Sequence, residues 1–135
     1  DAGTPAGIHP MAGRRDAMQA MLMIHGDTAR WNALSPEAVQ GAMGAYMAYS
    51  ESLRQAGIMR GGERLRPAPE AALVRVGADG APQVLDGPYA ETKEQLGGYF
   101  LIEVPDMDAA IQWAARCPGA AHGTVEVRPL WDSPG

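Results

Sequence analysis

The sequence predicts a single α+β domain in which strands and helices follow one another in the order β-α-β-β-β-α-β. Three observations support this prediction. Segments of strand length with continuous or alternating apolar residues occur near the start, in the second half and near the end of the chain. Two segments carry apolar residues at spacings of three and four, as helices do. The length of 135 residues is that of one ordinary domain.

The chain is predicted to begin with an irregular extension over residues 1–17, which is rich in Gly, Ala and Pro and has no periodicity. The folded domain is therefore expected over residues 18–132. An apolar run from Met18 to His25 is followed by Gly26 and Asp27. Such a run is typical of a buried first strand.

A long helix is predicted over residues 36–56. Ser35 is suited to cap its N-terminus, Pro36 suits the first turn, and Gly57 suits the C-terminal end. The residues expected to face inward are Val39, Met43, Tyr46, Ser50 and Leu53.

The middle of the chain is predicted to form three shorter strands. Residues 58–65 read as an edge strand that ends before Pro67. Residues 71–76 and 83–85 flank Asp79-Gly80, which is a hairpin-type turn. Residues 86–96 are predicted to form a compact loop.

The last third of the chain predicts a strand over residues 98–104, a helix over residues 107–116 and a strand over residues 124–130. Asp106 is suited to cap the helix. The helix residues expected to face inward are Met107, Ala110, Ile111 and Ala114. The complete order is that of a ferredoxin-like sandwich with an extra hairpin strand.

The strand patterns predict that both helices cover one sheet face. Val125 and Val127 should lie beneath the helices, so Glu126 and Arg128 should project from the other face. That helix-free face is expected to carry Met21, Met23, His25, Tyr99, Leu101 and Glu103 as well. A homodimer that encloses a partly polar cavity between two such faces would cover this mixed surface. The alternative is an open face with scattered apolar residues.

The composition narrows the classes of function. The formal net charge is −5, from 11 basic and 16 acidic residues, which disfavours nucleic acid and anionic membranes as partners. The longest apolar run, from Ala20 to Ile24, is too short to cross a bilayer. The single cysteine, Cys117, fits a reducing, cytoplasmic location.

The most distinctive stretch, residues 86–99, begins with Asp86-Gly87-Pro88-Tyr89. It resembles the YCII-related proteins of the DGPF type, whose motif has Phe where this chain has Tyr89. Further matches occur at residues 23–27, 61–63, 114–118 and 122–129, so the resemblance covers the chain from Met18 to Leu130. It implies a dimeric α+β barrel. It also implies a regulatory setting, because genes of this type often lie beside those of extracytoplasmic-function sigma factors.

The same stretch supplies the first candidate site residues. Glu91, Lys93 and Glu94 stand at acidic and basic positions of the resembled family. Glu91 or Glu94 could serve as a general base if partly buried, with Lys93 orienting an anionic group and Asp86 in the turn before them. The alternative is a charged surface loop with local ion pairs.

His122 is a second candidate acid–base group, because it precedes the strand that carries Glu126 and Arg128. Arg128 is the expected anchor for an anion. The alternative for His122 is a loop histidine bonded to a backbone carbonyl, and for His25 an exposed strand end. The further candidate ligand-binding residues are Tyr99, His25, Lys93, Glu94 and Glu126.

The broader YCII branch has been suggested to use a His on the first helix and an Asp before a Pro. This chain has no His on its first predicted helix and Cys117 before Pro118, so the resemblance does not supply that pair. Cys117 is interpreted as a packing residue. No cofactor is expected, and no metal site is predicted from one Cys and three scattered His.

The only basic concentration lies at Arg60, Arg64 and Arg66, with Arg54 nearby. This cluster suits either an anion site or a charged edge strand that opposes aggregation. Trp31, Trp113 and Trp131 are interpreted as packing or dimer-contact residues.

Two functions remain open. The first is a homodimer that binds, and converts by acid–base chemistry, a small polar or anionic metabolite in a cavity between the two sheet faces. The second is a non-catalytic regulatory module associated with an extracytoplasmic-function sigma factor.

Overall fold

The computed structural model describes residues 17–89 and 92–132. Its main sheet consists of β1 (Met18–Asp27), β2 (Met59–Arg64), β5 (Glu94–Val104) and β6 (Thr124–Pro129). The strands lie in the order β2-β5-β1-β6, and every neighbouring pair is antiparallel. This split arrangement confirms the predicted α+β, ferredoxin-like fold. The expected N-terminal extension lies almost entirely outside the described residues.

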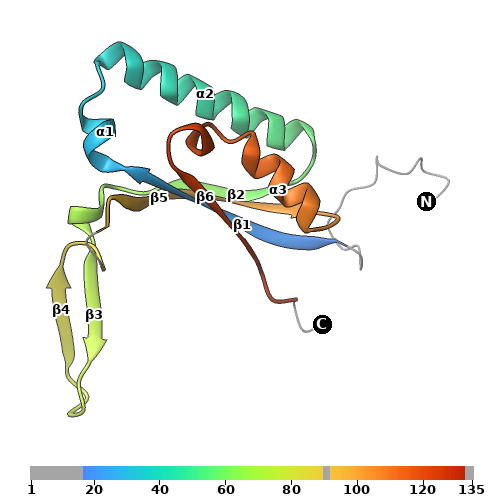
Figure 1. Cartoon of the computed structure of the whole chain (residues 1–135). Coiled ribbons are helices and arrows are strands. Elements are labelled where there is room, and N and C mark those ends of the chain that lie inside the picture. The colour runs from blue at the N-terminus through green and yellow to red at the C-terminus, as the bar shows by residue number, and fades with distance from the viewer. Residues whose placement is uncertain (1–16, 90–91, 133–135) are drawn as a thin grey trace.

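Two helices, α2 (Pro36–Gln55) and the shorter α3 (Met107–Ala115), cover the same face of the sheet (Figure 1). Each begins at its predicted cap: the Ser35 hydroxyl accepts a hydrogen bond from the Ala38 amide, and the Asp106 carboxylate accepts one from the Ala109 amide. A short helix, α1 (Thr28–Asn32), was not predicted. Five residues are too few to show a helical period.

The core lies between this sheet face and the helices. Ala20, Leu22, Ile102 and Val104 are almost fully buried. Tyr49 and Leu53 reach them from α2, and Ala110 and Ala114 from α3.

The predicted strand faces are confirmed, because Val125 and Val127 pack against the core while Glu126 and Arg128 alternate with them. The inward placement of Ile111 was wrong, since half of its surface is exposed. On the short α3 helix, Ala110 and Ala114 are buried, and Met107 and Trp113 pack against the core beside them.

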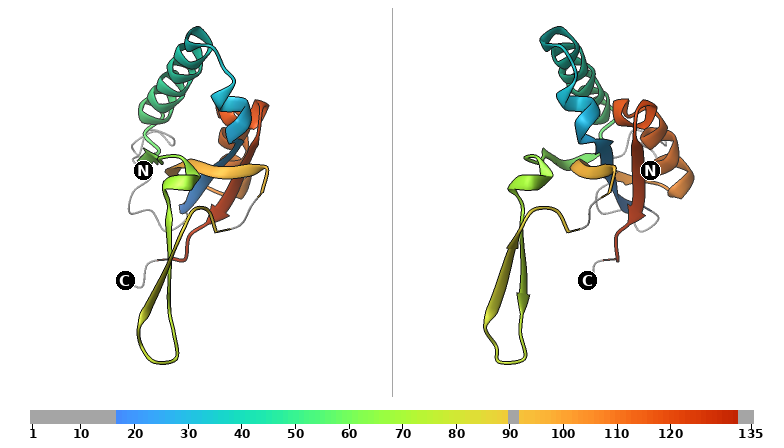
Figure 2. Two further views of the ribbon diagram at one scale, coloured as in Figure 1. Left: turned by 90° about the vertical axis from the view of Figure 1, so that its left-hand side faces the viewer. Right: turned by 60° about the vertical axis from the view of Figure 1, so that its left-hand side comes forward.

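The predicted hairpin forms, but it does not add a strand to the main sheet. β3 (Ala72–Val76) and β4 (Pro82–Asp86) make a separate two-stranded sheet that extends away from the body (Figure 2). Gly80 has a φ of +83° in the turn, and the Asp79 side chain accepts a hydrogen bond from the Ala81 amide. The residues that the structure describes also include two 3₁₀ turns, Ala68–Glu70 and Pro118–Ala121.

Candidate functional site

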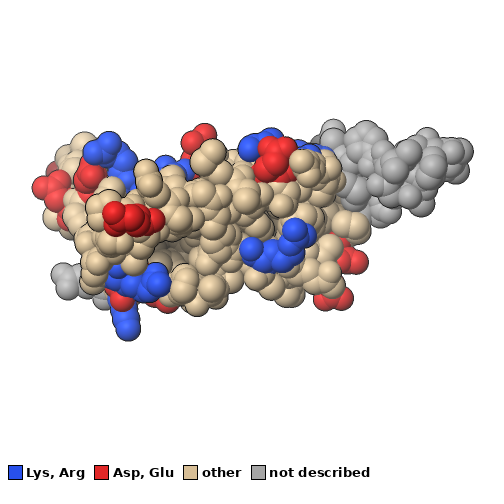
Figure 3. All heavy atoms as spheres, turned by 90° about the horizontal axis from the view of Figure 1, so that it is seen from above, with Lys and Arg blue, Asp and Glu red and all other residues tan. Residues whose placement is uncertain are grey.

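A groove of about 1660 Å³ lies on the helical side, between α1, the N-terminal half of α2 and the ends of β2 and β5. The two buried residues of α2, Tyr49 and Leu53, both lie in its C-terminal half. The N-terminal half therefore rises away from the sheet, as Figure 1 shows. Viewed from the helical side, the surface is hollowed and charged side chains stand near the hollow (Figure 3).

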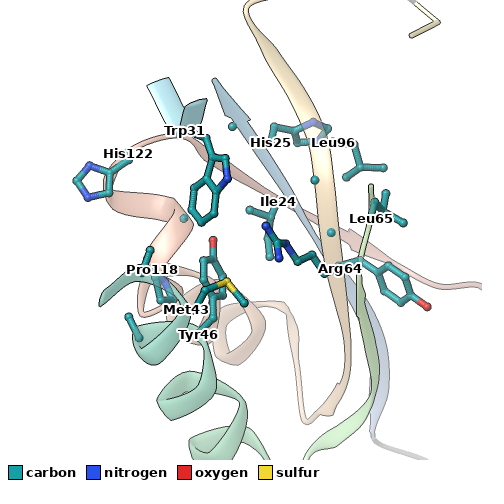
Figure 4. Close-up of a pocket in the computed structure, with 18 of the residues that line it drawn as sticks. Ile24, His25, Trp31, Met43, Tyr46, Arg64, Leu65, Leu96, Pro118 and His122 are labelled. Carbon is teal, nitrogen blue, oxygen red and sulfur yellow. The ribbon is translucent and has the colours of Figure 1, made fainter. Parts of the chain in front are cut away.

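Arg64 and Trp31 meet in this groove. The Arg64 guanidinium carbon lies 5.5 Å from the centre of the Trp31 ring, which is a cation–π distance. Within residues 17–89 and 92–132, no carboxylate lies close enough to pair with Arg64, whereas Arg66 pairs with Glu70. Figure 4 shows Trp31, Tyr46 and Arg64 directed toward one another across the groove. Arg64 thus offers an uncompensated positive charge beside an aromatic surface.

Tyr46 supplies a hydroxyl group to the same groove. Burial, together with the neighbouring Cys117 side chain, to which the Tyr46 hydroxyl donates a hydrogen bond, raises the pKa of Tyr46 to about 12, so the phenol stays protonated. A β-carbon at Gly119 would lie 2.6 Å from the Tyr46 hydroxyl oxygen and 2.8 Å from Ile24 Cγ2. The tyrosine occupies its position because residue 119 has no side chain.

The remaining walls of the groove are largely apolar. The labelled residues of this kind in Figure 4 are Ile24, Met43, Leu65, Leu96 and Pro118. Cys117 is buried behind them, and burial raises the pKa of its thiol. A raised pKa leaves the thiol protonated, which agrees with a packing role for Cys117.

The opposite, helix-free face carries three of the predicted site residues in one connected group. His25 Nε2 lies 3.0 Å from Glu126 Oε1, and the Arg128 guanidinium donates to the other oxygen of the same carboxylate. The Arg128 hydrogen bond first, and the His25 contact second, hold the pKa of Glu126 below its usual value. The carboxylate therefore stays charged and links an imidazole to a guanidinium.

Glu94 and Tyr99 lie on the same face but outside that group. Glu94 Oε1 accepts a hydrogen bond of 2.8 Å from the Thr124 hydroxyl. Tyr99 is half-buried and stands opposite Met23 on β1 and Glu63 on β2.

Glu103, near the end of the same face, is buried, with 6% of its surface exposed. It accepts a hydrogen bond of 3.3 Å from the side-chain amide of Gln19, and Arg60 Nε lies 3.4 Å from its carboxylate. The strand pattern of the sequence predicts Glu103 on this face, but it does not predict the contacts with Gln19 and Arg60.

The other predicted site residues are dispersed. Asp86 is exposed at the end of the β4 strand, and Lys93 is exposed just before β5. His122 is exposed at the margin of the helical-side groove (Figure 4). Glu91 lies outside the described residues. The candidates therefore occupy both faces of the sheet as well as the hairpin.

Sequence reasoning did not identify the groove. The sequence predicts Arg64 as part of a basic cluster, Trp31 as a packing or dimer-contact residue and Tyr46 as an inward-facing residue of the first long helix. In the described part of the chain, no three His, Cys, Asp or Glu side chains gather in a way that could hold a metal ion. Among the same residues, no helix has the length and apolarity needed to cross a membrane.

Comparison with known proteins gives the family. The sequence model of the YCII-related domain matches residues 17–133. An uncharacterized protein of Rhizobium meliloti (strain 1021) is 36% identical over 111 residues, which cover 81% of this chain and 89% of the relative. With the fold and both faces of its sheet described, this match over most of the chain is decisive: the chain belongs to the YCII-related domain family.

Proposed function

We propose that this YCII-related protein binds a small organic anion with an aromatic or apolar body in the groove between α1, α2 and the sheet. The observation that carries this proposal is the Arg64 guanidinium, held at the Trp31 ring without a carboxylate partner among the described residues. The ligand is thus a small anion, as expected from the sequence, and its proposed site lies on the helical side of the sheet and not on the helix-free face.

The chemistry of the groove favours a carboxylate on a flat or apolar body. An arginine fork can donate two parallel hydrogen bonds to a carboxylate, which a lysine cannot do. Trp31 supplies a surface for stacking beside the arginine. The groove exceeds the usual pocket volume of roughly 300–1,000 Å³, so such a ligand would fill only the part near Arg64.

Calorimetric titration with benzoate and phenylacetate tests this proposal, with the neutral benzamide as the ligand control. We expect the carboxylates to bind and Arg64→Gln to weaken their affinity by about tenfold or more, since a charge-assisted hydrogen bond is worth about 1.5–3 kcal/mol. The matched control is Arg75→Gln on β3, which changes the net charge equally on the distant hairpin. Equal binding by wild type and Arg64→Gln, or no binding of any carboxylate, contradicts the proposal.

The connected group His25, Glu126 and Arg128 supports a second candidate function, which is proton transfer on the helix-free face. A carboxylate that orients an imidazole is a common arrangement in general acid–base catalysis. In this proposal the protein is a cytoplasmic homodimer whose two helix-free faces enclose that group. Light scattering that gives one 14.2 kDa subunit for the wild type would contradict the dimer.

The motif Asp86-Gly87-Pro88-Tyr89 supports assignment to the DGPF type within the family. Gly87 has a φ of +96°, and its amide donates a hydrogen bond of 2.8 Å to the Ala71 carbonyl. The motif thus closes the base of the hairpin, which accounts for its glycine without any catalytic role. A non-catalytic module associated with a sigma factor is the alternative function. Co-purification of a sigma factor with this protein, together with the absence of anion binding, would favour this alternative function.

A further inference from the structure

The β3–β4 hairpin (residues 72–86), here called the arm, pairs with no strand of the main sheet within the described part of the chain. Its ladder runs only between its own two strands, from the pair Ala72 and Asp86 to the pair Val76 and Pro82. Figures 1 and 2 show the arm extending from one end of the sheet. A hairpin of two strands is only marginally stable in water when nothing covers it.

One face of the arm is almost entirely apolar. Because side chains alternate along a strand, Ala72, Val74, Val76, Pro82 and Val84 share this face, with only Asp86 at its base. Val74, Val76 and Val84 are 61%, 67% and 60% exposed. The opposite face carries Arg75 and Gln83 beside the two leucines of the pair Leu73 and Leu85. An exposed apolar strand face of this kind is a surface that proteins normally cover.

The position of the arm indicates what covers it. The arm extends toward the helix-free side of the sheet, away from α2 and α3 (Figure 1). That sheet face carries Met21, Met23 and Leu101, all half-buried. A molecule docked on this face would therefore lie beside the arm.

The size of the arm argues against a separate partner. A stable interface buries about 800 Å² on each side, which the few small side chains of the arm cannot supply alone. The arm and the helix-free face together form a larger surface. A second copy of this chain fits that surface, since in a twofold dimer each protomer offers both an arm and a face that needs cover.

We propose that the arm is a dimer clasp, whose Val74, Val76 and Val84 face packs against the second protomer. This inference rests on the homodimer proposed above and names a further part of its interface. It also explains why the arm leaves its own main sheet: the strands of the clasp bury their apolar face on the partner instead of on the parent domain.

Sedimentation equilibrium of the full chain tests the clasp. We expect Val84→Glu to raise the dimer dissociation constant at least tenfold, because it places a carboxylate in the buried face of the arm. The matched control is Gln83→Glu, which adds the same charge on the same strand but on the opposite face. Equal dissociation constants for wild type and Val84→Glu would overturn the clasp and leave the dimer standing, whereas a monomeric wild type would overturn both.

A second measurement keeps the test valid if Val84→Glu unfolds the arm. A photoreactive benzophenone amino acid is placed at position 84 or, as the control, at position 83. Irradiation is expected to give a covalent species of twice the chain mass from position 84 and little from position 83. Absence of that species at position 84, or equal yields at both positions, would overturn the assignment of the apolar face to the partner.

Discussion

His25 and Glu126 come from two adjacent strands and lie 3.0 Å apart between Nε2 and Oε1. Because this contact and the Arg128 hydrogen bond stabilise the charged carboxylate, the pKa of Glu126 is lower in the folded chain than in the unfolded one. The resulting stabilisation is complete above the unfolded pKa of about 4.3 and is lost as the pH falls through the lower folded pKa. We therefore predict that Glu126→Gln flattens the loss of Tm between about pH 5 and pH 3.

The control for this prediction is Glu51→Gln, which removes a carboxylate from the exposed surface of α2, where it pairs with Arg54. Its Tm profile should follow that of the wild type in shape. Thermal melts followed by circular dichroism across the pH range provide the measurement. A Glu126→Gln profile as steep as the wild-type profile would show that this carboxylate does not contribute to acid unfolding.

The Tyr49 hydroxyl is expected to stabilise the packing of α2 against α3. This hydroxyl donates a hydrogen bond of 2.6 Å to the Trp113 carbonyl, and the Tyr49 ring packs edge-on against Phe100. Tyr49→Phe keeps the ring but leaves the carbonyl without this donor, so we expect a loss of about 1–2 kcal/mol in the free energy of unfolding. Urea unfolding measures it, with the exposed Tyr89→Phe as the control. Equal losses in both variants would contradict a specific role for the Tyr49 hydroxyl.

The sequence could predict those parts of the fold that depend on local patterns. The alternation of Val125 and Val127 with charged residues placed the two faces of β6, because the strand period is two. The Asp79-Gly80 turn also allowed the hairpin to be located, because a turn is likewise a local sequence pattern. The start of β5 at Glu94 was not predicted because Glu94 and the two glycines Gly97 and Gly98 have little strand propensity. Pairing with β1 across a bulge at Ile24 and His25 makes them a strand.

The candidate site was less predictable because it depends on distances between elements. His25 and Glu126 were both named, but their contact joins positions 101 residues apart and follows from the register of β1 and β6. The groove depends on the tilt of α2, which Tyr49 and Leu53 set by packing only at one end. No local pattern encodes that tilt, so Trp31 could not be distinguished from a core tryptophan.

Two glycines are predicted to respond in opposite directions to alanine. Gly41 is exposed on α2 and a β-carbon there would contact nothing, so Gly41→Ala should stabilise the protein by about 0.5–1 kcal/mol. At Gly123, a β-carbon would lie 2.3 Å from the His25 carbonyl oxygen. Because the backbone must move to make room for this β-carbon, Gly123→Ala should lower the free energy of unfolding by about 1–3 kcal/mol. Urea unfolding of both variants gives the two signs, and a neutral Gly123→Ala would contradict the close approach.

Trp31 is expected to contribute to the affinity of the groove for benzoate. If the Trp31 ring holds the Arg64 guanidinium in place, Trp31→Leu should weaken benzoate binding by about two- to fivefold, because an exposed cation–π contact is worth about 0.5–1 kcal/mol. The matched control is Trp131→Leu, since Trp131 is 98% exposed and lies beyond the end of β6. Titration calorimetry measures both affinities. Unchanged binding in Trp31→Leu combined with a loss in Arg64→Gln would mean that the arginine acts without the ring.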